Sequence, residues 1–181
     1  SDVYKRQDLD NVIEFINNKN LTVAGALITH GHYDHSLGLS SFEGKAYINL
    51  DDEFLARNPQ DQIRSLLGNS FEVGEYTGDL FSISELPSDI VKVHTNPGHT
   101  KGSVSYEFPD EGLIFTGDFV FKDGIGRTDL FTGSMDEMKN SINNTFLNFN
   151  EEYEILPGHG PSDKVLSLIH ISEPTRPLSI S

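Results

Sequence analysis

The sequence predicts an α/β fold, because segments typical of strands and segments typical of helices alternate along it. The clearest strand is the apolar run 23–28, which is short and continuous like a buried strand. In the first helix-like segment, Leu9, Val12 and Ile13 recur at helical spacing. Since no internal repeat, low-complexity segment or shift in composition divides the chain, we expect a single domain.

The first half of the chain contributes two helical regions and a second strand. Asp8 or Asp10 can cap the first helix, since a carboxylate accepts free backbone N–H groups there. Residues 45–49 form a short strand after the apolar run. Residues 51–67 are helical in pieces, because the Asn58–Pro59 step interrupts them.

The second half begins with a strand at residues 90–94, where apolar and polar side chains alternate. Residues 103–108 and 113–116 are two further strands. They form a hairpin, because the turn-forming residues 109–112 separate them.

A helix and a last strand complete the expected elements. Residues 134–137 have the pattern of a capping box, which predicts that a helix starts there. This helix would turn Met138, Ile142 and Phe146 inward. Residues 154–156 form the last strand.

The two ends of the chain, residues 1–7 and 166–181, resemble translated sequencing adapters. We exclude such segments from the fold and predict that the domain proper spans residues 8–165. His170 is therefore not expected to bind a metal ion. We expect the domain to be a fragment that lacks strands before Leu9 and further chain after Val165.

The composition is acidic, with 13 basic and 28 acidic residues and a net charge of −15. Without the terminal segments the count is 10 basic and 26 acidic residues, or −16. Such a surface repels phosphate backbones, which argues against nucleic acid as a partner. No apolar run is long enough to span a membrane, and there are no cysteines. We expect a cytoplasmic protein that acts on a small molecule.

The most informative motif follows the apolar run directly and contains His30, His32, Asp34 and His35. Imidazole and carboxylate groups are ligands that suit zinc, iron or manganese. Four such groups so close in sequence cannot all reach one small ion. His30 and His32 can face one ion, and Asp34 and His35 are better placed for a second.

Three later segments repeat the order of a strand, a glycine and a metal-binding type of residue. They contain Pro97–Gly98–His99, Thr116–Gly117–Asp118 and Pro157–Gly158–His159. Glycine allows a tight turn and a close backbone approach beside the ligand. Together with the first motif, these residues can supply two ligand sets, one of imidazoles and one that includes a carboxylate.

The motifs, in this order, resemble those of the metallo-β-lactamase superfamily, and within it the single-domain glyoxalase II-like hydrolases. The resemblance covers residues 9–161 and implies a four-layer αβ/βα sandwich with the metals at one edge. It implies that the first metal binds to His30, His32 and His99, and the second to Asp34, His35 and His159. Asp118 would bridge the two, where the commonest β-lactamase subclass has a cysteine.

The same resemblance implies the chemistry. Two divalent metal ions, zinc first and iron or manganese as alternatives, would share a hydroxide that attacks the substrate carbonyl. Asp34 would orient that hydroxide while remaining a ligand.

Two cationic residues are candidate contacts for an anionic substrate. Arg127 can bind a carboxylate through two hydrogen bonds, or it can make a structural contact with Asp129. Lys101, two residues after His99, can be an anion contact or a lysine at the rim. His94 lies on a strand and is expected to pack rather than to bind metal.

These observations predict a metal-dependent hydrolase of a small thioester such as a hydroxyacylglutathione. One alternative is a mono-iron persulfide dioxygenase, which would leave Asp34, His35 and His159 unused as ligands. A second alternative is a metal-binding domain without catalysis.

Overall fold

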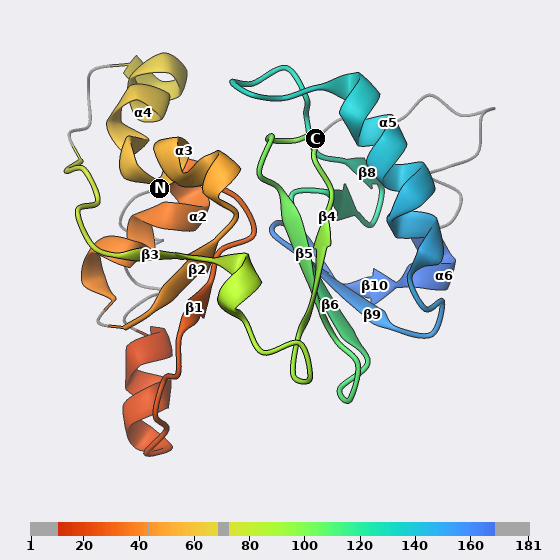
Figure 1. Ribbon diagram of the computed structural model, residues 1–181, viewed down its shortest axis with the longest axis horizontal. Coiled ribbons are helices and arrows are strands. Elements are labelled where there is room, and N and C mark those ends of the chain that lie inside the picture. Colours follow the sequence, from red (N-terminus) through yellow and green to blue (C-terminus); the bar gives the residue numbers. More distant parts are fainter. Residues whose placement is uncertain (1–10, 43, 69–72, 169–181) are drawn as a thin grey trace.

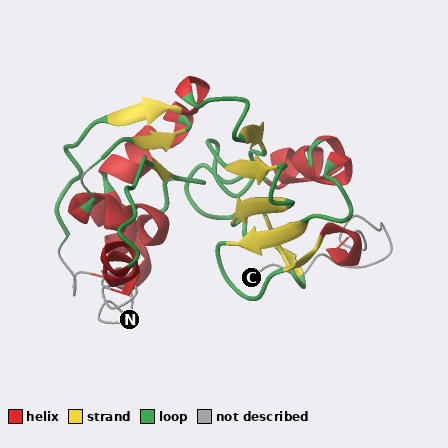
Figure 2. Cartoon of the chain, turned by 90° about the horizontal axis from the view of Figure 1, so that it is seen from below, coloured by secondary structure: helices red, strands yellow, loops and turns green. Residues whose placement is uncertain are grey.

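The computed structural model describes residues 11–42, 44–68 and 73–168 and shows two halves side by side (Figure 1). Each half contains a β-sheet and its own helices, so the chain has the αβ/βα arrangement predicted from the sequence. Figure 2 gives a second view, in which the strands of each half are grouped together.

The first sheet has three parallel strands in the order β1 (Ala26–Leu27), β2 (Ala46–Ile48) and β3 (Leu80–Ser82). The predicted strand 23–28 is reduced to two residues, because only Ala26 and Leu27 are in register with β2. The predicted strand 45–49 is confirmed as β2, whereas β3 was not predicted.

Helices precede the first sheet and connect its strands. Residues 11–18 are helical as predicted, and the side chains of Val12 and Ile13 are exposed; the proposed caps and Leu9 lie outside the described residues. After β2 come the 3-10 helix η2 (Leu50–Asp52), α3 (Glu53–Arg57) and α4 (Pro59–Leu67). The predicted interruption is confirmed, since Pro59 begins α4 at a position where its missing N–H costs no helical hydrogen bond.

The second sheet has five strands in the order β10-β9-β6-β5-β4. Their bounds are β4 (Lys92–Thr95), β5 (Val104–Phe108), β6 (Leu113–Gly117), β9 (Glu154–Pro157) and β10 (Asp163–Lys164). The predicted hairpin is confirmed as the antiparallel pair β5 and β6. Since β4 and β6 are both antiparallel to β5, and β9 is parallel to β6, the strands β4, β6 and β9 run in the same direction.

The core of the second half lies between this sheet and helices α5 (Met135–Asn144) and α6 (Val165–Leu168). Ser134 caps α5 by accepting the N–H of Glu137 at 3.3 Å, which is one half of the predicted capping box. The other half is not formed, because the N–H of Ser134 donates to the carbonyl of Gly98 at 2.8 Å. Met138 and Ile142 are buried, and Phe146 is buried just beyond the helix, in the 3-10 helix η5 (Phe146–Asn148). The same core contains a short hairpin of β7 (Val120–Phe121) and β8 (Gly124–Ile125).

The suspected adapter segments are only partly described. Residues 1–7 lie outside the described part of the chain, while Leu168 is buried in the core of the second half. The domain boundary at residue 165 stays a prediction.

The two sheets meet through side chains of β5. The buried hydroxyl of Tyr106 donates a hydrogen bond to the carbonyl of Ile28 at 2.9 Å. Val104 packs in a cluster with Leu27 of β1. These contacts bring the end of β1 to the start of β5. Within the described residues, no helix has the length and apolar character needed to cross a membrane.

Candidate metal centre

The candidate ligands follow the ends of four strands. His30 and His32 follow β1, and His99, Asp118 and His159 follow β4, β6 and β9. Because β4, β6 and β9 run in the same direction, their ends meet at one edge of the second sheet. The N–H of Val104 donates to the carbonyl of Thr29 at 2.9 Å and holds the loop after β1 at that edge. The structure therefore brings together residues that are up to 129 positions apart in the sequence.

Asp34 and His35 lie on a short helix that was not predicted from the sequence. Helix α2 (Tyr33–Ser36) begins directly after His32. Its N-terminal residue is held by Gln62 of α4, whose Oε1 accepts the N–H of Tyr33 at 3.0 Å.

The first ligand group consists of His30, His32 and His99. All three are buried, with exposed fractions of 1%, 7% and 3%. One nitrogen atom from each lies within 4.8 Å of the other two, and Nδ1 of His32 is 2.8 Å from Nε2 of His99. Three imidazoles so close together can hold a single small cation.

Burial also keeps these imidazoles neutral. It lowers the pKa of His32 to about 4, with a further contribution from the nearby His99. Burial lowers the pKa of His30 well below its usual value and lowers that of His99 as well. A neutral imidazole has the free lone pair that metal coordination requires.

The second group consists of Asp34, His35 and His159, whose ligand atoms also lie within 4.8 Å of one another. Nε2 of His159 is 3.3 Å from Oδ2 of Asp34 and 3.3 Å from Nε2 of His35. This group is less buried than the first, and the side chain of His159 is 54% exposed. The second group therefore faces the solvent side of the centre.

Asp118 lies between the two groups. Its Oδ2 is 3.6 Å from Nε2 of His99 and 3.6 Å from Nε2 of His159, and its Oδ1 is 3.4 Å from Nε2 of His35. Burial raises the pKa of this carboxyl, but the neighbouring histidines outweigh that effect and leave the pKa below its usual value. An ionised carboxylate between two ligand groups is suited to bridge two cations.

The donor set fits divalent metal ions. In the described part of the chain, Nε2 of His30 and Oδ1 of Asp118 are buried polar atoms without a hydrogen-bond partner. Buried polar atoms are seldom left unpaired, so each calls for a partner outside the protein. Both residues belong to groups whose ligand atoms lie within 4.8 Å of one another. A metal ion would satisfy both.

The two predicted substrate contacts are both held by acidic residues. The guanidinium of Arg127 donates two hydrogen bonds to Asp129, at 2.7 and 2.9 Å. Nζ of Lys101 donates to Asp51 at 2.9 Å. The structural contact between Arg127 and Asp129 is thus present, and binding of substrate by either cation stays a prediction.

His94 lies outside the centre, as expected. Its Nε2 is 2.7 Å from Oε2 of Glu107, and its ring packs against Phe149. His170 lies outside the described residues.

Sequence reasoning missed two groups that contact the ligand loops. The backbone carbonyl of Arg127 lies 2.7 Å from Nδ1 of His99. The carboxylate of Asp52 is buried beneath the loops of the first group, and burial raises its pKa against the opposing effect of hydrogen bonds from Thr100, Gly31 and Gly102. No sequence signal marks a particular carbonyl, but Asp52 follows a strand as the predicted ligands do.

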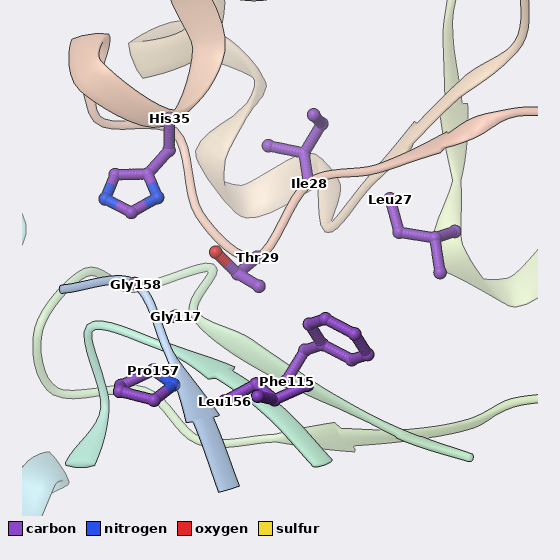
Figure 3. Close-up of a pocket in the computed structure, with 9 residues that line it drawn as sticks. All are labelled: Leu27, Ile28, Thr29, His35, Phe115, Gly117, Leu156, Pro157 and Gly158. Atoms are coloured by element: carbon purple, nitrogen blue, oxygen red, sulfur yellow. The ribbon is translucent and has the colours of Figure 1, made fainter. Parts of the chain in front are cut away.

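A pocket opens beside the second group, between the two halves of the molecule (Figure 3). His35 lies on one side of it and Phe115 on the other. Gly117 and Gly158, which precede Asp118 and His159, also line it. Apolar side chains that line the pocket, such as that of Phe115, therefore lie across the pocket from His35 of the second ligand group.

Comparisons with known proteins indicate the family of this chain. The profile of the Metallo-beta-lactamase superfamily matches residues 5–159. The "Probable metallo-hydrolase YqgX" of Bacillus subtilis (strain 168) is 34% identical over 164 residues, which cover 85% of this chain and 76% of that protein. The "Hydroxyacylglutathione hydrolase GloC" of Haemophilus influenzae is 30% identical over 161 residues, covering 84% of this chain and 76% of that protein.

Solved structures show the same fold. TTHA1623, solved in a di-iron-bound form, superposes with a TM-score of 0.78 at 21% identity, covering 88% of this chain and 81% of that one. The family profile spans residues 5–159, and the two relatives are 34% and 30% identical over most of this chain, so the assignment rests on sequence as well as on fold. The chain belongs to the metallo-beta-lactamase superfamily.

Proposed function

We propose that this chain is a metallo-hydrolase that holds two divalent metal ions and hydrolyses a small anionic thioester of the hydroxyacylglutathione type. The observation that carries the proposal is the position of Asp118, whose Oδ2 is equidistant from His99 of the first group and His159 of the second. The relative from Haemophilus influenzae, named a hydroxyacylglutathione hydrolase, supports the choice of substrate.

In this proposal, His30, His32 and His99 hold one ion, and Asp34, His35 and His159 hold the other. Asp118 bridges them. Zinc suits these imidazole and carboxylate donors best, and iron or manganese suits them as well. When bound, such ions lower the pKa of water and polarise the substrate carbonyl.

The side chains of the protein supply position and charge. Asp34 is partly exposed beside His159, so its carboxylate can accept a hydrogen bond from the attacking water and orient it. The buried histidines of the first group exclude solvent from one side of the centre. The negative charges of Asp34 and Asp118 offset the mutual repulsion of two cations.

Arg127 and Lys101 would hold the anionic part of the substrate. The backbone carbonyl of Arg127 contacts the ring of His99, and Lys101 follows His99 by two residues in the sequence. The guanidinium of Arg127 and the ammonium of Lys101 are exposed. Each would share its charge between its acidic partner and the substrate.

A substrate panel tests this function. Metal-loaded protein is offered S-lactoylglutathione, a simpler thioester, a β-lactam, a phosphodiester and glutathione persulfide. We expect the thioesters to be hydrolysed fastest. Oxygen uptake with the persulfide and no thioester turnover would instead establish the mono-iron dioxygenase alternative. Metal binding with no turnover of any substrate would favour a non-catalytic metal-binding domain.

A further inference from the structure

Asp52 is a fully buried carboxylate at the end of η2, outside both ligand groups. Its two oxygen atoms accept three hydrogen bonds. Oδ2 accepts the N–H of Gly31 at 2.8 Å and the hydroxyl of Thr100 at 2.6 Å. Oδ1 accepts the N–H of Gly102 at 2.7 Å. Hydrogen bonds to an ionised acceptor are about twice as strong as those between neutral groups.

Two of the three donors lie next to ligands of the first group, and the third, Gly102, lies three residues after His99. Gly31 separates His30 from His32, and Thr100 follows His99 directly. The two loops belong to different halves of the molecule, since one follows β1 and the other follows β4. A single side chain therefore joins the two chain segments that carry all three imidazoles.

The packing around Asp52 leaves no room for adjustment. A Cβ atom added to Gly31 would lie 2.6 Å from the carbonyl oxygen of Asp52 and 2.7 Å from Cβ of Leu55. A Cβ atom added to Gly102 would lie 2.6 Å from Cγ of Asp52. Only glycine allows both loops to approach the carboxylate this closely. The other backbone group of Gly31 is also held, because its carbonyl accepts a hydrogen bond from Gln62 at 3.2 Å.

Asp52 is connected less directly to the second ligand group. Among the described residues, its hydrogen bonds do not reach the loops that carry Asp118 or His159. Asp34 and His35 lie on helix α2, beyond His32. Loss of the carboxylate should therefore weaken the first group more than the second.

We propose that Asp52 is a positioning residue, which joins the loops of His30, His32 and His99 and sets the distances within the first ligand group. The inference rests on the proposed two-metal site. It states that Asp52 controls the metal affinity of the first ligand group, which is one of the two metal positions. Outer-sphere partners of metal ligands commonly change metal affinity by ~10–100-fold when they are removed.

The test is a titration of the metal-free chain with cobalt(II), followed by calorimetry and by visible absorption. Asp52→Asn keeps the shape of the side chain but leaves one acceptor oxygen in place of two. We expect two binding events in the unsubstituted chain. In the variant, one event should weaken by ~10–100-fold with an altered absorption band, and the affinity of the other should change much less.

Glu107→Gln is the matched control, because it also changes a buried carboxylate to an amide. The partners of Glu107, Lys92 and His94, are not metal ligands. We expect this variant to lower the free energy of unfolding while both cobalt affinities stay unchanged. Thr100→Val removes one of the three hydrogen bonds to Asp52, and it provides the same test if Asp52→Asn does not fold. It should weaken the same event by a smaller factor.

Several outcomes would overturn the inference. Unchanged affinities in Asp52→Asn, equal weakening of both events, or the same selective loss in Glu107→Gln would each contradict it. If the unsubstituted chain binds two cobalt ions in those cases, the proposed metal site stands and only the role of Asp52 fails. If the unsubstituted chain binds fewer than two, the metal site fails as well.

Discussion

Nδ1 of His99 lies 2.7 Å from the backbone carbonyl of Arg127. Since a carbonyl only accepts hydrogen bonds, Nδ1 must carry the proton, and the lone pair of neutral His99 is on Nε2. That nitrogen faces Nδ1 of His32 within the first ligand group. Arg127 thus fixes the ring of His99 through its backbone, while its side chain points to Asp129.

Because the backbone and the side chain of Arg127 have different partners, a substitution can test the role of the side chain alone. Arg127→Ala keeps the carbonyl, so the metal content should not change. We expect KM for an anionic thioester to rise more than kcat falls, because only substrate charge is lost. Steady-state kinetics and elemental analysis measure both effects. A loss of metal together with kcat would show that the guanidinium supports the centre instead.

Asp118→Asn tests the bridge between the two groups. The variant keeps the shape of the side chain but removes the charge, so two cations would repel each other without compensation. We expect metal affinity to fall by at least ~10–100-fold and hydrolysis to be nearly abolished. The control is Asp123→Asn, an exposed carboxylate in the neighbouring β7–β8 turn. Full activity and metal content in Asp118→Asn would rule out the bridging role.

Gly158→Ala tests how closely the chain packs against the second group. A Cβ atom at this position would meet Oδ1 of Asp118 and would lie 2.6 Å from Cε1 of His35. We expect weaker metal binding at the second group, measured by competition with a chelator. Gly74→Ala is the control, since a Cβ atom there meets nothing within 4 Å. Equal affinities in the two variants would contradict the geometry.

The ion pairs of Glu107 predict a pH-dependent stability. Burial raises the pKa of this carboxyl, but hydrogen bonds from Lys92 and His94 outweigh it and leave the pKa below its usual value of 4.5. The pairs therefore stabilise the fold above pH 4.5, and the contribution is lost as the pH falls through the lowered pKa.

Glu107→Gln should accordingly cost about 1–3 kcal/mol of unfolding free energy at pH 7. The difference from the unsubstituted chain should shrink as the pH falls below 4.5. Denaturant unfolding at several pH values measures it, with the exposed turn residue variant Glu111→Gln as control. A difference that stays constant with pH would assign the effect to packing rather than to charge.

The sequence predicted which side chains come together better than the elements that carry them. His99, Asp118 and His159 could be found because each follows a strand and a glycine, a pattern that is local in the sequence. The helix that carries Asp34 and His35 was missed, because a single turn of four residues has no periodicity to detect. β3 was also missed, although β2, which has the same length of three residues, was found.

Contacts between distant segments were also beyond sequence reasoning. The hydrogen bond from Thr100 to Asp52 spans 48 positions, and the contact of His99 with the Arg127 carbonyl spans 28. The first depends on how the two halves pack, to which the hydrogen bond from Tyr106 to the carbonyl of Ile28 contributes. The second depends on how two loops of the second half meet. A linear pattern cannot contain that information.

The number of metal ions bound per chain tests the central proposal most directly. Protein purified without chelator is analysed for zinc, iron and manganese, and the sum is divided by the protein concentration. Seven ligands arranged in two groups around Asp118 predict close to two metal ions per chain. A reproducible value of one, with iron as the metal, would contradict the two-metal centre and the hydrolase built on it.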